Sequence, residues 1–203
     1  MHVGALFSTV EKYLAALPEG IHSYPDSVVK GTIVRAVAEM IREDRSVRIG
    51  LPVETLHLID EPPLVSEWIP EVHLNVMFSA ISEARHAGRD SFETWAYEGN
   101  RRLFSGPIYR AVFGVLGPER IMPRVHIRWA AFRRGTTLSP IEMSDTGGTL
   151  RLGYEPYLMP EVALRAMRGA FRAVADATGA KQLRVTYDQE SPTSTVFQVR
   201  WAR

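Results

Sequence analysis

Residues 135–154 read GTTLSPIEMSDTGGTLRLGY, and they mark the point at which the spacing of apolar residues along the chain changes. Before Gly135, apolar residues recur at helical spacing, whereas after it apolar and polar residues alternate as in a half-buried strand. The two alternating runs flank the letters DTGG, in which the pair Gly147–Gly148 tolerates the positive φ of a tight hairpin. This stretch therefore predicts a β-hairpin. It also divides the chain into a mainly helical part, residues 1–134, and a strand-rich part, residues 135–203.

The residues after the hairpin complete a ββαββ unit. Pro160 begins an amphipathic helix that carries Met167, Phe171 and Val174 on its apolar face. The runs KQLRVTYD and TVFQVRW predict two further strands around the turn QESP. We therefore predict an α+β fold in a single domain of residues 1–203. A helical N-terminal part packs on a C-terminal four-stranded, mainly antiparallel sheet in the order strand–strand–helix–strand–strand.

The helical part is predicted from repeated apolar spacing. The stretch VVKGTIVRAVAEMIRE, residues 28–43, carries Val29, Ile33, Val37 and Ile41 on one face. Gly31 in the same stretch indicates a place where the backbone packs closely against a neighbour. The same spacing predicts further helices over residues 71–88, 91–104, 108–116 and 119–132.

Composition excludes several classes of protein. The chain of 203 residues is 45% hydrophobic and 23% charged, which predicts a packed core rather than disorder. Its net charge of +1 argues against nucleic acid as the main partner. Without cysteine it has no disulfide, thiol nucleophile or thiolate metal site. No stretch reaches the ~18–20 apolar residues of a membrane span, and MHVGALFSTVEKYL is not typical of a signal peptide. We expect a cytoplasmic protein.

Two histidines in the helix predicted over residues 71–88 face different surroundings. At about 100° per residue, Met77 lies on the same apolar side as His73, whereas Asn75 and His86 lie on the polar side. His73 is therefore predicted to be partly buried, and His86 to be exposed. A neutral imidazole at His73 can coordinate a metal or a haem iron, or it can fill the core while one ring nitrogen donates to a backbone carbonyl. The sequence leaves both alternatives open.

Motifs for catalysis and metal binding are missing from the sequence. It has no HExxH pair, no Gly-x-Ser-x-Gly elbow, no phosphate loop and no dinucleotide fingerprint. We therefore expect neither an enzyme nor a dedicated metal site.

Aromatic and basic residues supply the remaining candidates. The aromatics between residues 95 and 113 form a core, or line a cavity if that core is incompletely filled. The arginines Arg165, Arg168 and Arg172 line the polar face of the helix that begins at Pro160. They form either a solvated face or a surface for an acidic protein partner, because arginine is favoured in interfaces.

The order of motifs suggests a family. The chain carries YPDSVVKGTIV near its start, FETWAYEGNRRLFSGPIYRAVFGVLGPERIMPRV in the middle, and AKQLRVTYD with VFQVRW at its end. It resembles the superfamily of haem-nitric-oxide-binding and 4-vinyl-reductase-like domains, and more specifically a paralogous family of unknown function abundant in myxobacteria. The resemblance implies small-molecule binding, including haem, or a regulatory or assembly role. The haem-binding branch uses a Tyr-x-Ser-x-Arg motif, but YEPYL at residues 154–158 lacks the serine and the arginine, so haem is not expected.

Two functions follow as expectations. The first is a non-enzymatic small-molecule-binding or sensory module, with an apolar pocket between helices and sheet for a hydrophobic ligand of unknown identity. The second is an interaction or assembly module without a ligand, which binds a protein partner or a second copy of itself. The residues predicted to contact the ligand are His73, Met77, Trp95, Phe104, Tyr109 and Phe113.

Overall fold

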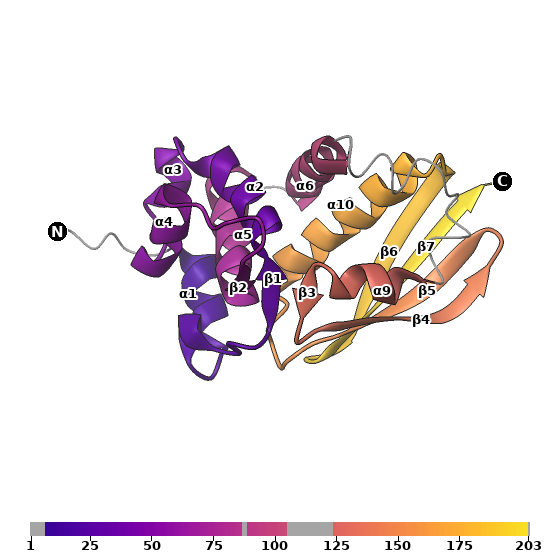
Figure 1. Ribbon diagram of the computed structural model, residues 1–203, viewed down its shortest axis with the longest axis horizontal. Helices are drawn as coiled ribbons and strands as arrows, with labels where there is room; N and C mark the ends of the chain where they lie inside the picture. The colour runs from indigo at the N-terminus through magenta and orange to yellow at the C-terminus, as the bar shows by residue number, and fades with distance from the viewer. Residues whose placement is uncertain (1–6, 87–88, 105–123, 203) are drawn as a thin grey trace. The chain divides into compact units, whose positions relative to one another are not determined.

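The computed structural model describes residues 7–86, 89–104 and 124–202 (Figure 1). The helix predicted over residues 108–116 lies outside these ranges. The α+β prediction is confirmed, because helices come first and a four-stranded antiparallel sheet follows. The chain forms two compact units, and the prediction of a single domain stays a prediction. The first unit comprises residues 1–92, 132–135 and 155–163, and the second comprises residues 93–131, 136–154 and 164–203.

Helices form most of the first unit (Figure 1). The longest of them, α5 (Glu71–Arg85), contacts the four other α-helices of this unit, α1 to α4. It is therefore buried around much of its circumference, and the polar residues in its sequence need partners inside the protein. The helices are α1 (Ser8–Ala15), the short 3-10 helix η1 (Gly20–His22), α2 (Gly31–Ile41), α3 (Arg45–Arg48), α4 (Val53–Asp60) and α5 (Glu71–Arg85).

A small antiparallel sheet that the sequence did not predict completes the first unit. Its strands are β1 (Val28–Lys30), β2 (Trp68–Pro70) and β3 (Arg133–Arg134), in the order β2-β1-β3.

The helix predicted from residue 28 is therefore wrong over its first three residues, which form β1. Helix α2 begins only at Gly31, and its buried face includes Val34. The continuous helical spacing from residue 28 had predicted Ile33 on that face instead. The close packing predicted at Gly31 is confirmed, since an added Cβ would lie 2.1 Å from the Leu64 carbonyl oxygen.

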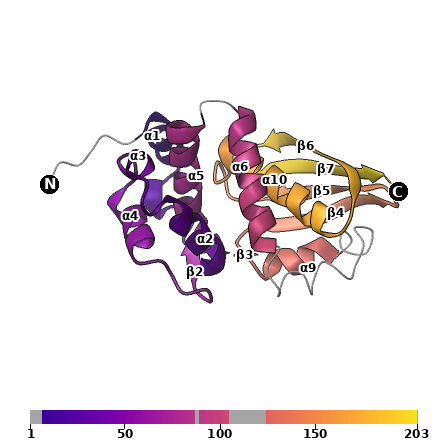
Figure 2. The ribbon, with the colours of Figure 1, turned by 90° about the horizontal axis from the view of Figure 1, so that it is seen from above.

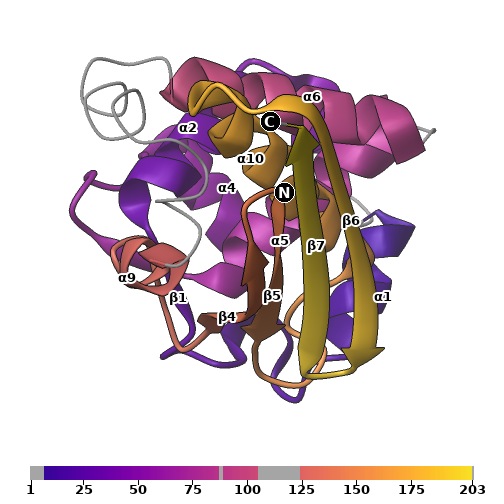
Figure 3. The same cartoon turned by 90° about the vertical axis from the view of Figure 1, so that its right-hand side faces the viewer.

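The second unit is built on the sheet predicted from the sequence (Figure 3). Leu150 on β5 lies opposite Phe197 on β7, and both side chains are buried. The strands are β4 (Thr137–Ser144), β5 (Gly147–Gly153), β6 (Lys181–Ser191) and β7 (Ser194–Ala202), in the antiparallel order β4-β5-β7-β6.

The role predicted for Gly147–Gly148 is wrong. Both glycines are buried residues of β5, and neither has a positive φ. The hairpin turn consists instead of Asp145 and Thr146. Position 147 has no room for a side chain, because an added Cβ would lie 2.7 Å from the carbonyl oxygen of Val199 on the neighbouring strand.

Helix α10 (Glu161–Ala177) covers one face of this sheet, as predicted (Figure 3). The rings of Phe171 and Phe197 meet edge to face, with 4.9 Å between their centroids. On its other side, α10 crosses α6 (Arg89–Phe104), where Gly169 allows the backbone of Tyr97 to approach (Figure 2). The short helix α9 (Val125–Ala130) lies beside β4, and its Trp129 donates a hydrogen bond to Thr136.

Candidate functional site

His73 lies in the first turn of α5 and is half-buried, as predicted. Its Nδ1 lies 3.1 Å from the hydroxyl oxygen of Thr55, a fully buried residue of α4. The partner is thus a side-chain hydroxyl rather than the backbone carbonyl considered from the sequence. Burial lowers the pKa of His73, with opposing charge effects from Glu54 and His22. The ring is therefore neutral at physiological pH, and Nδ1 is engaged by Thr55.

His86 was predicted to be exposed, and this prediction is wrong. Helix α5 ends at Arg85, so His86 is its C-terminal cap and leaves the helical path on which the prediction depended. The residue is half-buried, and its ring packs edge to face against Phe92 with 6.0 Å between centroids. Its Nδ1 lies 3.2 Å from the Ser91 hydroxyl.

A buried ion pair lies at the start of α5. The Nε of Arg133 on β3 lies 3.1 and 3.2 Å from the two carboxylate oxygens of Glu71, which is fully buried. Burial raises the pKa of Glu71, and the positive charge of Arg133 opposes that rise. The Glu71 N–H also donates to the Ser27 carbonyl. This pair therefore fastens the segment 132–135 to α5.

A second buried polar contact lies one turn further along α5. Asn75 was predicted to be on the polar face, but it is fully buried. Its Nδ2 donates to the Leu158 carbonyl at 2.8 Å, and the Tyr13 hydroxyl donates to the same carbonyl at 2.9 Å. Burial raises the pKa of Tyr13, so its hydroxyl stays protonated and remains a donor. These two bonds fasten the segment 155–163 to α5.

The polar residues of α5 follow a four-residue spacing that was not predicted. Glu71, Asn75, Ser79 and Glu83 lie on one side of the helix, and Glu83 accepts hydrogen bonds from the N–H groups of Ser8 and Thr9. Because residues four apart share a helix face, this stripe was visible in the sequence. Its distant partners, Arg133 and the Leu158 carbonyl, carry no such signal.

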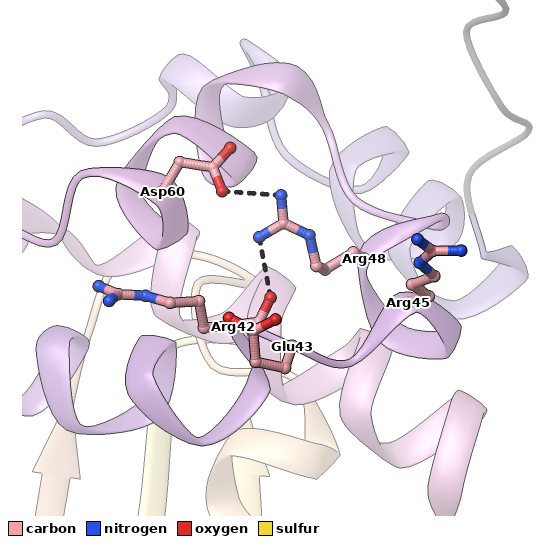
Figure 4. Close-up of a pocket in the computed structure, with 5 residues that line it drawn as sticks. All are labelled: Arg42, Glu43, Arg45, Arg48 and Asp60. Atoms are coloured by element: carbon pink, nitrogen blue, oxygen red, sulfur yellow. Dashed lines mark hydrogen bonds and ion pairs between the residues drawn. The ribbon is translucent and has the colours of Figure 1, made fainter.

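A surface pocket of about 360 Å³ lies at the end of α2 (Figure 4). Its central residue is Arg48, whose Nη2 lies 2.7 Å from Asp60 and whose Nη1 donates to the Arg42 carbonyl at 3.3 Å. Arg48 therefore satisfies a carbonyl group at the end of a helix. Glu43 and Arg45 complete a lining of mixed charge, which does not suit a hydrophobic molecule.

The other residues predicted to contact a ligand are distributed over both units. Met77 is fully buried in the first unit, one turn after His73. Trp95 is half-buried in the second unit. The side chain of Phe104, and the residues Tyr109 and Phe113, lie outside the described part of the chain. The structure thus brings together His73 and Met77 alone among the predicted contacts that it describes.

The arginines predicted as an interaction surface make contacts within the second unit. Arg168 forms an ion pair with the buried Glu93, and Arg172 lies 3.3 Å from the same carboxylate. The guanidinium carbon of Arg172 also lies 4.9 Å from the centroid of Tyr97. Arg165 is half-buried. Two of the three arginines therefore help to attach α10 to α6.

Neither a metal cluster nor a membrane span was found in the part of the chain that the structure describes. Within residues 7–86, 89–104 and 124–202, no three His, Asp or Glu side chains are grouped so as to hold a metal ion. None of the described helices is long and apolar enough to cross a bilayer.

The fold of the chain is similar to that of solved H-NOX proteins. The chain matches the crystal structure of an unliganded Fe(II) H-NOX protein from K. algicida with a TM-score of 0.62 and 9% identity, over 86% of this chain and 97% of that one. An oxygen-binding H-NOX domain related to soluble guanylate cyclases matches with a TM-score of 0.54 and 14% identity, over 86% and 95%. At these identities the likeness shows the fold alone.

The sequence of the second half of the chain shows the family to which the protein belongs. The family described as "Protein of unknown function (DUF2378)" has a model that matches residues 94–202, more than half of the chain, and the protein belongs to this family. No curated protein is similar enough in sequence to count as a match.

Another H-NOX structure of similar fold concerns haem distortion, which raises the question of whether residues of this chain fit haem. In the segment singled out by the resemblance, the Tyr154 hydroxyl lies 2.8 Å from Thr195 Oγ1 on β7 and accepts a hydrogen bond from Gln189 on β6, so it is engaged by two side chains of the sheet. The pocket at the end of α2 offers none of the side chains that ligate haem iron. Neither place fits a haem group.

Proposed function

We propose that this protein is a non-enzymatic sensory or regulatory module that binds a small hydrophobic molecule. The observation that carries the proposal is the H-NOX fold, shared over 86% of the chain with proteins that include an oxygen-binding domain. The family match adds no activity, because the family is one of unknown function. The Tyr154 segment does not support haem, so the proposal concerns a different small molecule.

Within the first unit, His73 and Met77 are the proposed ligand contacts. His73 is the more accessible of the two, because its ring is half-buried whereas Met77 is fully buried. Thr55 holds Nδ1, which leaves Nε2 as the ring atom available to a ligand. A neutral imidazole suits a hydrophobic molecule with one polar group, since it offers a single hydrogen bond without a buried charge.

Native mass spectrometry of the purified full chain tests this proposal. We expect a co-purified small molecule as additional mass that is released on denaturation, and a several-fold lower occupancy in His73→Ala. The control is His57→Ala, which removes an exposed histidine of α4 from the same unit. A chain without additional mass, also after incubation with a lysate extract of small molecules, would contradict the proposal. Equal occupancy in both variants would contradict the role of His73.

A second candidate function, an interaction module, is favoured by exposed apolar residues on the first unit. Ile49 after α3 and Val53 at the start of α4 are 68% and 73% exposed. Large apolar side chains this exposed can mark a contact with another protein chain. Light scattering after size exclusion tests this alternative for a homodimer, and the double variant Ile49→Lys, Val53→Lys should then convert a dimer into a monomer.

A further inference from the structure

Three side chains converge on one face of the small sheet in the first unit. Lys30 on β1 lies opposite Trp68 on β2, and Val28 on β1 lies opposite Arg134 on β3. Opposed residues of antiparallel strands share a face, as do residues two apart on one strand. Lys30, Trp68 and Arg134 therefore share one face, whereas Arg133 projects from the other face toward Glu71.

The indole ring of Trp68 contacts the charged groups of both Lys30 and Arg134. The Lys30 ammonium lies 4.3 Å from the centroid of the Trp68 ring, and the Arg134 guanidinium carbon lies 4.0 Å from it. Both distances are well within the range of a cation–π contact. The two positive charges consequently lie against the same ring.

Neither cation is neutralised in the part of the chain that the structure describes. Arg133 has Glu71 as its partner, but no carboxylate is paired with Lys30 or Arg134 among the described residues. Glu67, the acid next to Trp68 in the sequence, accepts a hydrogen bond from the Leu64 N–H instead. An aromatic ring fixes the position of a cation without cancelling its charge. The face therefore presents two positive charges that no carboxylate of the described residues pairs with.

We propose that the Lys30–Trp68–Arg134 face binds the phosphate group of a small molecule. A phosphate monoester carries a charge of about −1.5 to −2 at neutral pH, which matches two cations. The guanidinium fork of Arg134 donates two parallel hydrogen bonds to phosphate oxygens, and Lys30 adds a compact charge. Arg134 is exposed, and Lys30 and Trp68 are half-buried, so a ligand can reach all three. This site is separate from His73 and stands independently of the proposed sensory function.

Nuclear magnetic resonance of the full chain tests the site through the indole N–H of Trp68, assigned by Trp68→Phe. The probes are inorganic phosphate, phenyl phosphate, acetate and chloride at constant ionic strength. We expect a saturable shift of the Trp68 signal with both phosphates, and at least a tenfold weaker affinity in Lys30→Gln and in Arg134→Gln. Arg35→Gln is the matched control, because it removes an exposed arginine of α2 in the same unit.

Several results would overturn the proposal. They are a shift that does not saturate, an equal response to chloride or acetate, or unchanged affinity in both glutamine variants. Arg134→Lys keeps the charge but loses the guanidinium fork, so it should bind phosphate more weakly than the natural protein and more tightly than Arg134→Gln. A folded Arg134→Lys that binds phosphate no better than Arg134→Gln would also count against the proposal. Thermal melting of each variant identifies any that fails to fold, and Lys30→Gln and Arg134→Gln then test the site independently.

Discussion

At the scale of single residues, the buried Glu71 depends on a charged partner. Its carboxylate is fully buried, and its charged partner is Arg133, which comes from a segment far away in the sequence. We predict that Arg133→Met lowers the free energy of unfolding by about 3–5 kcal/mol, because it leaves a buried charge without a partner. Urea unfolding of the full chain measures the loss.

A second substitution separates this charge effect from lost packing. Glu71→Gln combined with Arg133→Met should recover a large part of the loss, since removal of both charges leaves no buried carboxylate. Arg35→Met is the control, because the exposed pair of Arg35 with Glu39 contributes little. A double variant that is no more stable than Arg133→Met alone would contradict this account.

His73 makes stability depend on pH in a direction that its burial fixes. Burial lowers its pKa in the folded protein below the unfolded value of about 6.5. The unfolded chain therefore binds the proton more readily, and the stability associated with neutral His73 is present above pH 6.5 and lost as pH falls through the folded pKa.

His73→Gln should accordingly reduce the loss of stability between pH 7.5 and pH 5, as measured by urea unfolding at both values. Burial also lowers the pKa of His86, so His86→Gln should act in the same direction, and the two variants should be compared. Titration of the ring protons by nuclear magnetic resonance checks the premise directly. A His73 ring that titrates at or above 6.5 would contradict it.

At the scale of elements, the long strands and helix α10 were predicted from the sequence, whereas the shortest strands were not. The strands β4 to β7 are seven to eleven residues long, so alternation had room to appear, and α10 showed its apolar face over four turns. The strands β1, β2 and β3 are two or three residues long and pair across the sequence. Such short strands have no detectable period, and β1 also continued the apolar spacing of α2.

The candidate site was likewise predicted only in part from the sequence. The half-buried position of His73 followed from helical geometry, because its neighbours on α5 are local. Its partner Thr55 and the ion pair of Glu71 with Arg133 depend on contacts between distant segments. A sequence without an alignment carries no information on such pairs.

Helix α10 depends on Phe171 for its attachment to the sheet. The edge-to-face contact with Phe197 at 4.9 Å places that ring over β7. Phe171→Asp should therefore unfold the second unit or lower its stability by more than about 4 kcal/mol, since it replaces a packed ring by a charge in an apolar layer. Circular dichroism during heating measures the change. Ala177→Gln alters an exposed position of the same helix and should leave the melting temperature unchanged.

At the scale of the whole molecule, the first unit is not continuous in sequence. Residues 132–135 and 155–163 belong to it, although they follow the middle of the chain. They supply the charge that compensates Glu71, the carbonyl bound by Asn75 and Tyr13, and the fully buried side chain of Leu158. The helices of the first 92 residues therefore lack part of their own core and of their polar partners until later residues are present.

We accordingly predict that a fragment of residues 1–92 does not fold by itself. Without the later segments, β1 has no partner on one edge, and three polar groups of the core lose bonds whose absence costs about 1–3 kcal/mol each. Such a loss removes most of the stability expected for a unit of this size. The fragment should show poorly dispersed amide signals and no cooperative melting, whereas the full chain should show both dispersion and a sharp transition. A fragment that melts cooperatively at the temperature of the full chain would mean that the inserted segments are attached to an already complete unit.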